Sequence, residues 1–352
     1  MKNILCIAGD GIGPEIMKSA LEILEVVSKK YSFEYKIEEE LFGGASIDAY
    51  GEPFSDKLKE KIENCNAILM GSVGGQKWDN AKVRPEAGLL ALRKYLKVYA
   101  NVRPLKVEDS LCYLSPLKEE IVKGIDLMIV RELTGGAYFG EPRRLEEKSA
   151  LDSITYSYEE IEQIVRYVFE TARKRRKKLT SVDKANVLAT SKLWRKVVED
   201  VAKDYDDVEV EHMYVDAMAM ALITSPTKYD VIVTENLFGD ILSDEVSVLG
   251  GSLGLLSSAS YSKDKIALYE PAHGSAPDIA GMDIANPIAM IYSLAMMLRY
   301  SFAQDKMADD IEHAVKSVLD EGCMTKDLNS QNYVSTSKFN YEIGRASCRE
   351  RV

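Results

Sequence analysis

Short continuous apolar runs that end in polar residues constrain the fold of this chain more than any other feature. Such runs lie at residues 2–8, 67–70, 127–130 and 231–234. After the first run, residues 15–28 carry apolar side chains at helical spacing. Continuous apolar strands that alternate with helices are typical of a largely parallel sheet covered on both faces. We therefore predict an α/β fold with ligands at the carboxyl ends of its strands.

Length and composition narrow the class of protein. A chain of 352 residues usually forms two cores, and a net charge of −11 argues against a nucleic-acid partner. Its five cysteines have no paired spacing, which indicates free thiols in a reducing compartment. Residues 1–8 lack the apolar core of a signal peptide, and the apolar stretch 287–298 is shorter than the about 20 residues that span a bilayer. We expect a cytoplasmic protein without a membrane partner.

A glycine cluster follows the first predicted strand, at Gly9, Gly11 and Gly13. A dinucleotide-binding fingerprint would need its third glycine at position 14, where this chain has Pro14. Proline suits the first turn of a helix. We interpret the cluster as a tight strand–helix turn and not as a nucleotide site.

Three arginines, Arg93, Arg103 and Arg131, lie near the ends of apolar segments. A single arginine at such a place could form a surface salt bridge. Three of them suit a pocket for a polycarboxylate, because the planar guanidinium binds carboxylates with two hydrogen bonds.

Two aspartates, Asp240 and Asp244, are spaced so that a helix would place both on one face. Their charges repel unless a cation lies between them, and oxygen ligands favour Mg²⁺ or Mn²⁺. The alternative, a solvated acidic helix face, fits the apolar surroundings poorly. Asp216, also among apolar residues, could supply a third carboxylate.

Lys184 follows a β-like stretch, and Tyr138 lies in a glycine-rich loop. A partly buried lysine can act as a base, and the tyrosine hydroxyl could reach a ligand. Either residue by itself is more often structural.

The motifs GDGIGPE, ANVRP, RELTGGAYFGEPR, DKANVL, ENLFGDILSD and EPAHGSAPDIAG occur in this order. From Ile4 to about Asn340 the chain thereby resembles the β-decarboxylating dehydrogenases, which oxidise isopropylmalate, isocitrate, homoisocitrate or D-malate/tartrate. The resemblance implies a two-domain α/β fold with a mostly parallel or mixed sheet, which is not a Rossmann fold. Residues 1–98 and 252–343 would form the first domain, and residues 99–251 an inserted domain with the contacts of a homodimer.

The resemblance also implies the cofactors, NAD with Mg²⁺ or Mn²⁺, and the site residues. It assigns the three arginines to substrate carboxylates, Tyr138 and Lys184 to proton transfer, and Asp216, Asp240 and Asp244 to the metal. Lys184 and Asp216, the latter also near the substrate, would come from the neighbouring subunit. The residues implied for NAD are Gly71, Ser72, Val73, Gly74, Gly75, His273, Gly274, Ser275, Ala276, Pro277, Asp278, Ile279 and Asn286.

Two departures within the family indicate the substrate and the cofactor. Leu89 and Leu90 stand where isocitrate enzymes carry polar residues, and they would pack on a branched alkyl group. Asp278 and Ile279 stand where NADP-using relatives have lysine and tyrosine, and an aspartate would repel a 2′-phosphate. The pattern is typical of the members that convert 3-isopropylmalate to 4-methyl-2-oxopentanoate and CO₂ in leucine biosynthesis.

The alternatives are activity on D-malate or homoisocitrate, and a non-catalytic regulatory subunit. A regulatory chain would be expected to lose the tyrosine, the lysine or a metal aspartate, and all are present here. Residues 343–352 resemble the translation of a sequencing-library adapter, so we predict that they form a non-native tail.

Overall fold

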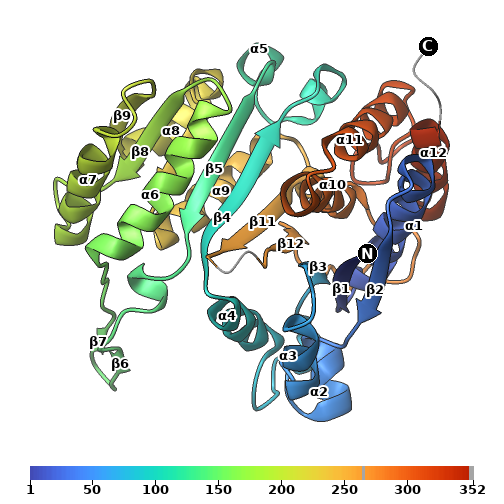
Figure 1. Ribbon diagram of the computed structural model, residues 1–352, viewed down its shortest axis with the longest axis horizontal. Helices are drawn as coiled ribbons and strands as arrows, with labels where there is room; N and C mark the ends of the chain where they lie inside the picture. Colours follow the sequence, from blue (N-terminus) through green and yellow to red (C-terminus); the bar gives the residue numbers. More distant parts are fainter. Residues whose placement is uncertain (264–265, 349–352) are drawn as a thin grey trace. The chain divides into compact units, whose positions relative to one another are not determined.

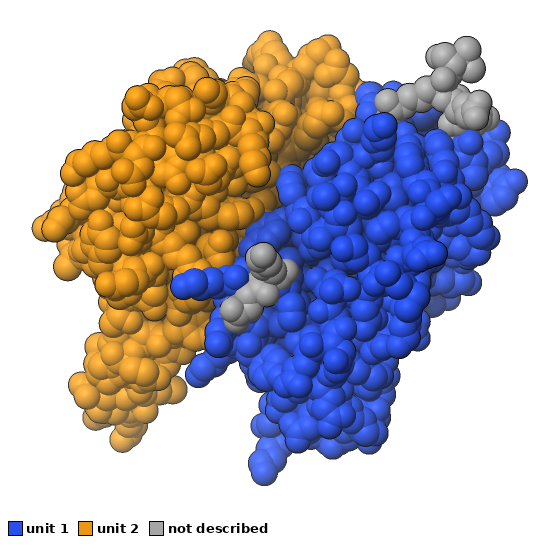
Figure 2. All heavy atoms as spheres, in the orientation of Figure 1, with its two compact units in different colours: residues 1–97, 252–352 blue, residues 98–251 orange. Residues whose placement is uncertain are grey.

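The fold comes from a computed structural model, which describes residues 1–263 and 266–348. The chain forms two compact units. Unit 1 combines residues 1–97 with residues from 252 onward, and unit 2 is the continuous segment 98–251 (Figure 2).

The sheet of unit 1 is mostly parallel. Its strands follow the order β2 (Tyr35–Glu39), β1 (Lys2–Gly9), β3 (Ala67–Ser72), β12 (Leu268–Pro271) and β11 (Ser257–Ser262). Pairing is parallel from β2 to β12, and β11 is antiparallel to β12. All residues of β3 are buried, as the continuous apolar run predicts. This order, with an antiparallel edge, differs from that of a Rossmann fold.

Four helices of unit 1 pack around this sheet and against one another. They are α1 (Gly13–Tyr31), α10 (Ile288–Phe302), α11 (Asp305–Asp320) and α12 (Thr336–Cys348). Shorter helical segments are α2 (Gly44–Tyr50), α3 (Asp56–Ile62), α4 (Pro85–Leu96), η1 (Gln76–Trp78) and η5 (Leu253–Leu255). Because α10 packs on the sheet and on α1 and α11, most of its residues are buried.

The predicted tail overlaps α12. Residues 343–348 continue this helix, Ile343 and Ser347 are buried, and Lys30 donates to the Ser347 carbonyl at 3.1 Å. Residues 349–352 lie outside the described part of the chain. The non-native origin of residues 343–352 stays a prediction.

Unit 2 has a second mostly parallel set of strands. Their order is β4 (Val98–Lys106), β5 (Asp126–Glu132), β10 (Val231–Thr234), β8 (Lys178–Asp183) and β9 (Glu209–Tyr214). β4 is antiparallel to β5, and the other neighbours are parallel. The α/β fold with a mixed, mostly parallel sheet is therefore confirmed.

Helices cover both faces of the unit 2 strands (Figure 1). One face carries α6 (Tyr158–Arg173) and α7 (Ala189–Ala202), and the other carries α8 (Val215–Thr224) and α9 (Asn236–Leu249). A small hairpin of β6 (Arg144–Leu145) and β7 (Ala150–Leu151) extends from the unit. The remaining segments are α5 (Glu119–Val122), η2 (Asp109–Leu114), η3 (Gly136–Tyr138) and η4 (Pro226–Lys228).

The glycine cluster after β1 packs against protein backbone. A Cβ on Gly11 would lie 2.0 Å from the Ser275 carbonyl oxygen, and one on Gly9 would lie 2.1 Å from that of Ser72. Both glycines have positive φ, and Pro14 lies in the first turn of α1. The cluster is thus the tight turn that the sequence predicts.

Two other expectations concern the whole chain. All five cysteines are free, as predicted. Among the described residues, no helix is long and apolar enough to cross a membrane.

Candidate active site

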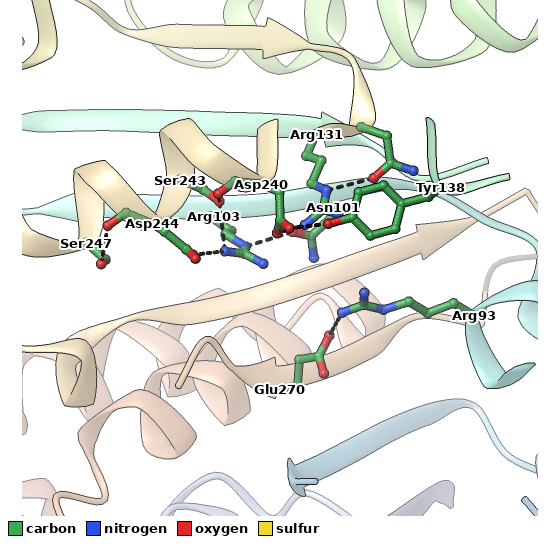
Figure 3. Close-up of polar contacts among 11 residues, drawn as sticks. Arg93, Asn101, Arg103, Arg131, Tyr138, Asp240, Ser243, Asp244, Ser247 and Glu270 are labelled. Carbon is green, nitrogen blue, oxygen red and sulfur yellow. Dashed lines mark hydrogen bonds and ion pairs between the residues drawn. The ribbon is translucent and has the colours of Figure 1, made fainter. Parts of the chain in front are cut away.

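Arg131, at the end of β5, is the centre of a polar cluster in unit 2 (Figure 3). Its side chain is 4% exposed. Its Nε donates to Asn236 Oδ1 at 2.9 Å, and its Nη1 donates to Asp240. The Tyr138 hydroxyl donates to the other oxygen of Asp240, and the guanidinium lies 5.1 Å from the Tyr138 ring centroid. Three predicted site residues from three different segments therefore meet here.

Helix α9 reaches this arginine because of Gly239. A Cβ at that position would lie 2.6 Å from Arg131 Cγ and 3.2 Å from Arg131 Cα. Any larger residue would push the helix away from β5. The glycine in the segment LFGD therefore sets the distance between Asp240 and Arg131.

Arg103 on β4 forms a second pair with α9 (Figure 3). Its Nη1 donates to Ser243 Oγ at 2.8 Å and to Asp244 Oδ1 at 3.1 Å, and its Nε donates to Asn101 at 2.9 Å. Asn101 lies opposite Arg131 in the β4–β5 register and two residues before Arg103 on β4, so it stands between the two arginines. The Asp244 side chain is 71% exposed, which leaves it accessible to a ligand.

The environment of Tyr138 keeps its hydroxyl protonated. Partial burial raises the pKa of Tyr138, and the hydrogen bond to Asp240 raises it further. A protonated phenol beside a carboxylate and an arginine can deliver a proton to a carbon or oxygen placed against it.

Asp240 and Asp244 lie on one helix face, as predicted. Each carboxylate pairs with an arginine, Asp240 with Arg131 and Asp244 with Arg103. Among the described residues of one chain, no three His, Cys, Asp or Glu side chains are grouped so that they could hold a metal ion. The donor chemistry nevertheless suits Mg²⁺ or Mn²⁺, since both ligands are carboxylates on one face.

Lys184 and Asp216 form a separate pair in unit 2. Lys184 directly follows β8, and its Nζ lies 2.5 Å from Asp216 Oδ1 in the first turn of α8. This contact lowers the pKa of Asp216, whose side chain is 64% exposed. The buried Asp183, held by two hydrogen bonds from Arg195, fixes the end of β8 before the lysine.

Unit 1 holds the third arginine on α4. Arg93 Nη2 lies 2.9 Å from Glu270 on β12, while its buried Nε has no hydrogen-bond partner. An unpartnered buried donor suits an anionic ligand. Leu89 and Leu90 precede Arg93 by four and three residues and so share its helix face, and Leu90 is 42% exposed. The arginine and the apolar side chains thus come from one face of α4.

The segment Gly71–Gly75 is held by buried Asp10. The Asp10 carboxylate accepts from the backbone N–H groups of Gly44, Ala45 and Gly74 at 2.8–2.9 Å. Burial raises the pKa of Asp10, and these three hydrogen bonds act against that shift. Ser275 Oγ donates to the Gly74 carbonyl at 2.8 Å, which joins the two segments assigned to NAD.

The segment that begins at His273 has an unpaired ring nitrogen and open space beside it. Its Nε2 is buried without a hydrogen-bond partner, and burial lowers its pKa, which favours the neutral ring. A Cβ on Gly274 would meet only open space, and Pro277 and Asp278 are exposed. These features suit a nucleotide cofactor. Asn286 differs, because its amide bonds Asp327 and the backbone N–H of Ile288.

Several residues of these clusters have no signal of their own in the sequence. They are Asp10, Asn101, Asn236, Ser243 and Glu270. Asn101 and Asn236 each stand within five residues of a predicted site residue, and Asp10 stands inside the GDGIGPE motif. All five stand inside one of the quoted motifs, so membership of a motif is the signal that could have found them.

Comparisons with known proteins agree over nearly the whole chain. The model of the isocitrate/isopropylmalate dehydrogenase family matches residues 3–343. The 3-isopropylmalate dehydrogenase of Staphylococcus saprophyticus is 56% identical over 96% of this chain and 98% of its own. That of Listeria innocua is 55% identical over 97% of both chains.

Solved structures show the same fold. The isocitrate dehydrogenase of Methylococcus capsulatus superposes with a TM-score of 0.89 at 34% identity, over 99% of this chain and 100% of that one. A β-decarboxylating dehydrogenase of Thermococcus kodakarensis, in its apo form, gives a TM-score of 0.83 at 34% identity, over 99% and 96% of the two chains.

Proposed function

Because the chain belongs to the isocitrate/isopropylmalate dehydrogenase family, we propose that it oxidises and decarboxylates 3-isopropylmalate in leucine biosynthesis. The products are 4-methyl-2-oxopentanoate and CO₂, with NAD and Mg²⁺ or Mn²⁺ as cofactors. The observation that carries this proposal is the cluster of Arg131, Asp240 and Tyr138. It combines a carboxylate-binding group, a metal-binding group and a protonated phenol within hydrogen-bonding distance.

The arginines bind the substrate carboxylates. Arg103 and Arg131 present guanidinium groups that now bond Asp244 and Asp240. A substrate carboxylate would replace part of these contacts if Asp240 and Asp244 held a metal ion. Arg93 contributes its unpartnered Nε, and Leu89 and Leu90 pack on the isopropyl group.

Tyr138 acts in proton transfer. A bound metal ion would polarise the 2-hydroxyl and its neighbouring carboxylate, NAD would accept the hydride from C2, and the Lys184–Asp216 pair of the neighbouring subunit would take the hydroxyl proton. Loss of the β-carboxylate as CO₂ leaves electron density on the carbon that carried it. The Tyr138 hydroxyl, kept protonated by burial and by Asp240, donates its proton to that carbon.

The segments Gly71–Gly75 and His273–Ile279 would hold NAD. The exposed carboxylate of Asp278 would accept hydrogen bonds from ribose hydroxyls and repel a 2′-phosphate. Asp10 and Ser275 hold the two segments together, and the neutral His273 has a free Nε2 for the cofactor. Asn286 supports this region through Asp327 and does not need to touch NAD.

The active unit is a homodimer with shared sites. Helices α8 and α9 expose large apolar side chains, which are Met220, Ile223, Ile241 and Val248. Such a patch on a protein without membrane-spanning helices in its described residues suits a subunit interface. Asp216 and Lys184 lie on or beside α8, so each chain lends them to the site of its partner. We place this enzyme in the cytoplasm.

Parallel assays of NADH formation test the substrate. With 3-isopropylmalate, isocitrate, homoisocitrate and D-malate, kcat/KM should be highest for 3-isopropylmalate. A third carboxylate placed against Leu89 and Leu90 should cost at least about 100-fold in kcat/KM. Tyr138→Phe keeps the ring and removes only the hydroxyl, so it tests whether the measured turnover depends on proton donation by Tyr138. This variant should lose about 100-fold or more in kcat. Turnover of isocitrate equal to that of 3-isopropylmalate would refute the assignment, and no turnover of any substrate would favour a regulatory chain.

A mixing experiment tests the shared site. Tyr138→Phe and Lys184→Met homodimers should each be nearly inactive. After subunit exchange, roughly half of the dimers are hybrids with one intact site, so about a quarter of wild-type activity should return. If both residues acted within one chain, every site would keep a defect. Hybrids that are present by native mass spectrometry but inactive would rule out the shared geometry.

A further inference from the structure

A buried carboxylate lies directly behind the loop that carries Tyr138. Glu132, the last residue of β5, is 0% exposed. We infer that Glu132 is a positioning residue, which sets the Tyr138 hydroxyl through the loop 133–137. The inference rests on the proposed role of Tyr138 in proton transfer.

The carboxylate of Glu132 accepts three hydrogen bonds from the start of this loop. Its Oε2 accepts from the Gly135 N–H at 2.9 Å, and its Oε1 accepts from the Thr134 N–H at 2.5 Å and from the Thr134 hydroxyl. Burial raises the pKa of Glu132, and these hydrogen bonds act against that shift. An ionised carboxylate suits this arrangement, since it accepts hydrogen bonds and donates none.

The next residues are confined by Tyr156. A Cβ on Gly135 would lie 2.7 Å from the Tyr156 ring, and one on Gly136 would lie 2.5 Å from its hydroxyl. Gly136 also has a φ of 74°, which disfavours other residues. Gly136 begins the single turn η3, which ends at Tyr138. The loop therefore has little freedom between Glu132 and the catalytic tyrosine.

Asn236 connects the same loop to the substrate arginine. Its backbone N–H donates to the Tyr156 hydroxyl at 3.0 Å, and its Nδ2 donates to the Gly135 carbonyl at 3.1 Å. Its Oδ1 accepts from Arg131 Nε at 2.9 Å. Asn236 thus holds both Arg131 and the loop that carries Tyr138, and both of these side chains bond Asp240.

A neighbouring glutamate provides the matched comparison. Thr234, the last residue of β10, is in register with Arg131, so Glu235, which follows β10, lies beside Glu132, which ends β5. Glu235 is also buried, at 4% exposed, but its Oε1 has no hydrogen-bond partner. The two residues share type, depth and sheet edge, and differ in their bonds to the Tyr138 loop.

A double-mutant cycle separates positioning from a general structural role. Glu132→Gln keeps the shape but turns an NH₂ group toward an N–H of the loop. In the presence of Tyr138 it should lower kcat for 3-isopropylmalate at least tenfold, with KM changed less than threefold. In the Tyr138→Phe background the same change should lower the residual kcat less than twofold, because the group being positioned is gone. The solvent deuterium isotope effect on kcat should rise in Glu132→Gln, since proton delivery becomes slower.

Further variants keep the result decisive. Glu132→Asp retains both acceptor oxygens and should give an intermediate kcat, which also serves if Glu132→Gln fails to fold. Glu235→Gln should leave kcat within threefold of wild type. Equal losses of kcat in the wild-type and Tyr138→Phe backgrounds would overturn the inference, as would an unchanged kcat. A wild-type enzyme that reduces NAD with none of the four substrates would instead overturn the proposed function.

Discussion

Gly239→Ala is the substitution whose effect the structure defines most sharply. Alanine is the better helix former, by about 1 kcal/mol in a helix interior. The added Cβ, however, would lie 2.6 Å from Arg131 Cγ and 2.7 Å from Arg131 Cβ, and backbone lies behind these atoms at 3.2 Å. Overpacking of this kind costs about 1–3 kcal/mol. The free energy of unfolding should therefore change between zero and a loss of about 2 kcal/mol.

A second helical glycine, Gly344, separates the steric cost of the added Cβ from the gain in helix propensity. A Cβ on Gly344 in α12 would lie 3.7 Å from Ile23 Cδ1, which is an ordinary contact. Gly344→Ala should therefore raise the free energy of unfolding by about 1 kcal/mol. The free energies of unfolding of the two variants should differ by about 1–3 kcal/mol.

Urea unfolding of both variants measures this difference, and steady-state kinetics measures its effect on the site. Because Arg131 must move when α9 shifts, Gly239→Ala should lower kcat/KM for 3-isopropylmalate about tenfold or more. Gly344→Ala should not change kcat/KM. If Gly239→Ala stabilises the protein as much as Gly344→Ala and keeps its kcat/KM, then α9 is not positioned by contact with Arg131.

Three further predictions address cofactor, protonation and metal. Asp278→Lys with Ile279→Tyr should shift the preference from NAD toward NADP, measured as the ratio of kcat/KM values, and an unchanged ratio would mean that Asp278 does not contact the ribose. Burial and the charge of Glu132 raise the pKa of Glu235 from 4.5 to about 7, so this group stabilises the fold below pH 4.5 and the contribution is lost as pH rises through 7. As pH rises between these values, the free energy of unfolding of Glu235→Gln should increase relative to that of wild type by up to about 3 kcal/mol. A difference in urea unfolding that does not change with pH would contradict this. EDTA should abolish NADH formation, and Mg²⁺ or Mn²⁺ should restore it; full activity in EDTA would argue against the metal.

The sequence predicts the strands that are continuous and apolar, and it misses the serine-rich strand β11. The runs at 2–8, 67–70, 127–130 and 231–234 correspond to β1, β3, β5 and β10. The strand β11 is different, since its buried residues include Ser257, Ser258 and Ser260. Serines can be buried when their hydroxyls find partners, but their hydropathy does not reveal it.

The same limit applies to the site. Arginines at strand ends and aspartates at helical spacing carry charge, so their positions alone indicate chemistry. Asn236 is a neutral amide, and its function depends on Arg131, which lies 105 residues earlier in the chain. Such a partner becomes known only when the chain is folded. Motif resemblance finds the charged residues, and the structure is needed for the amides and buried carboxylates that hold them.

The discontinuous make-up of unit 1 has a consequence for synthesis on the ribosome. Strand β3 pairs with β12, whose residues are made about 200 residues later, roughly 10–40 s at typical elongation rates. During that interval the apolar edge of β3 lacks its neighbour, and α1 lacks α10 and α12. Unit 2, a continuous segment, can complete its own core in the meantime. The nascent chain should therefore bind chaperones through its first hundred residues, and release should follow emergence of β12 and the helices after it.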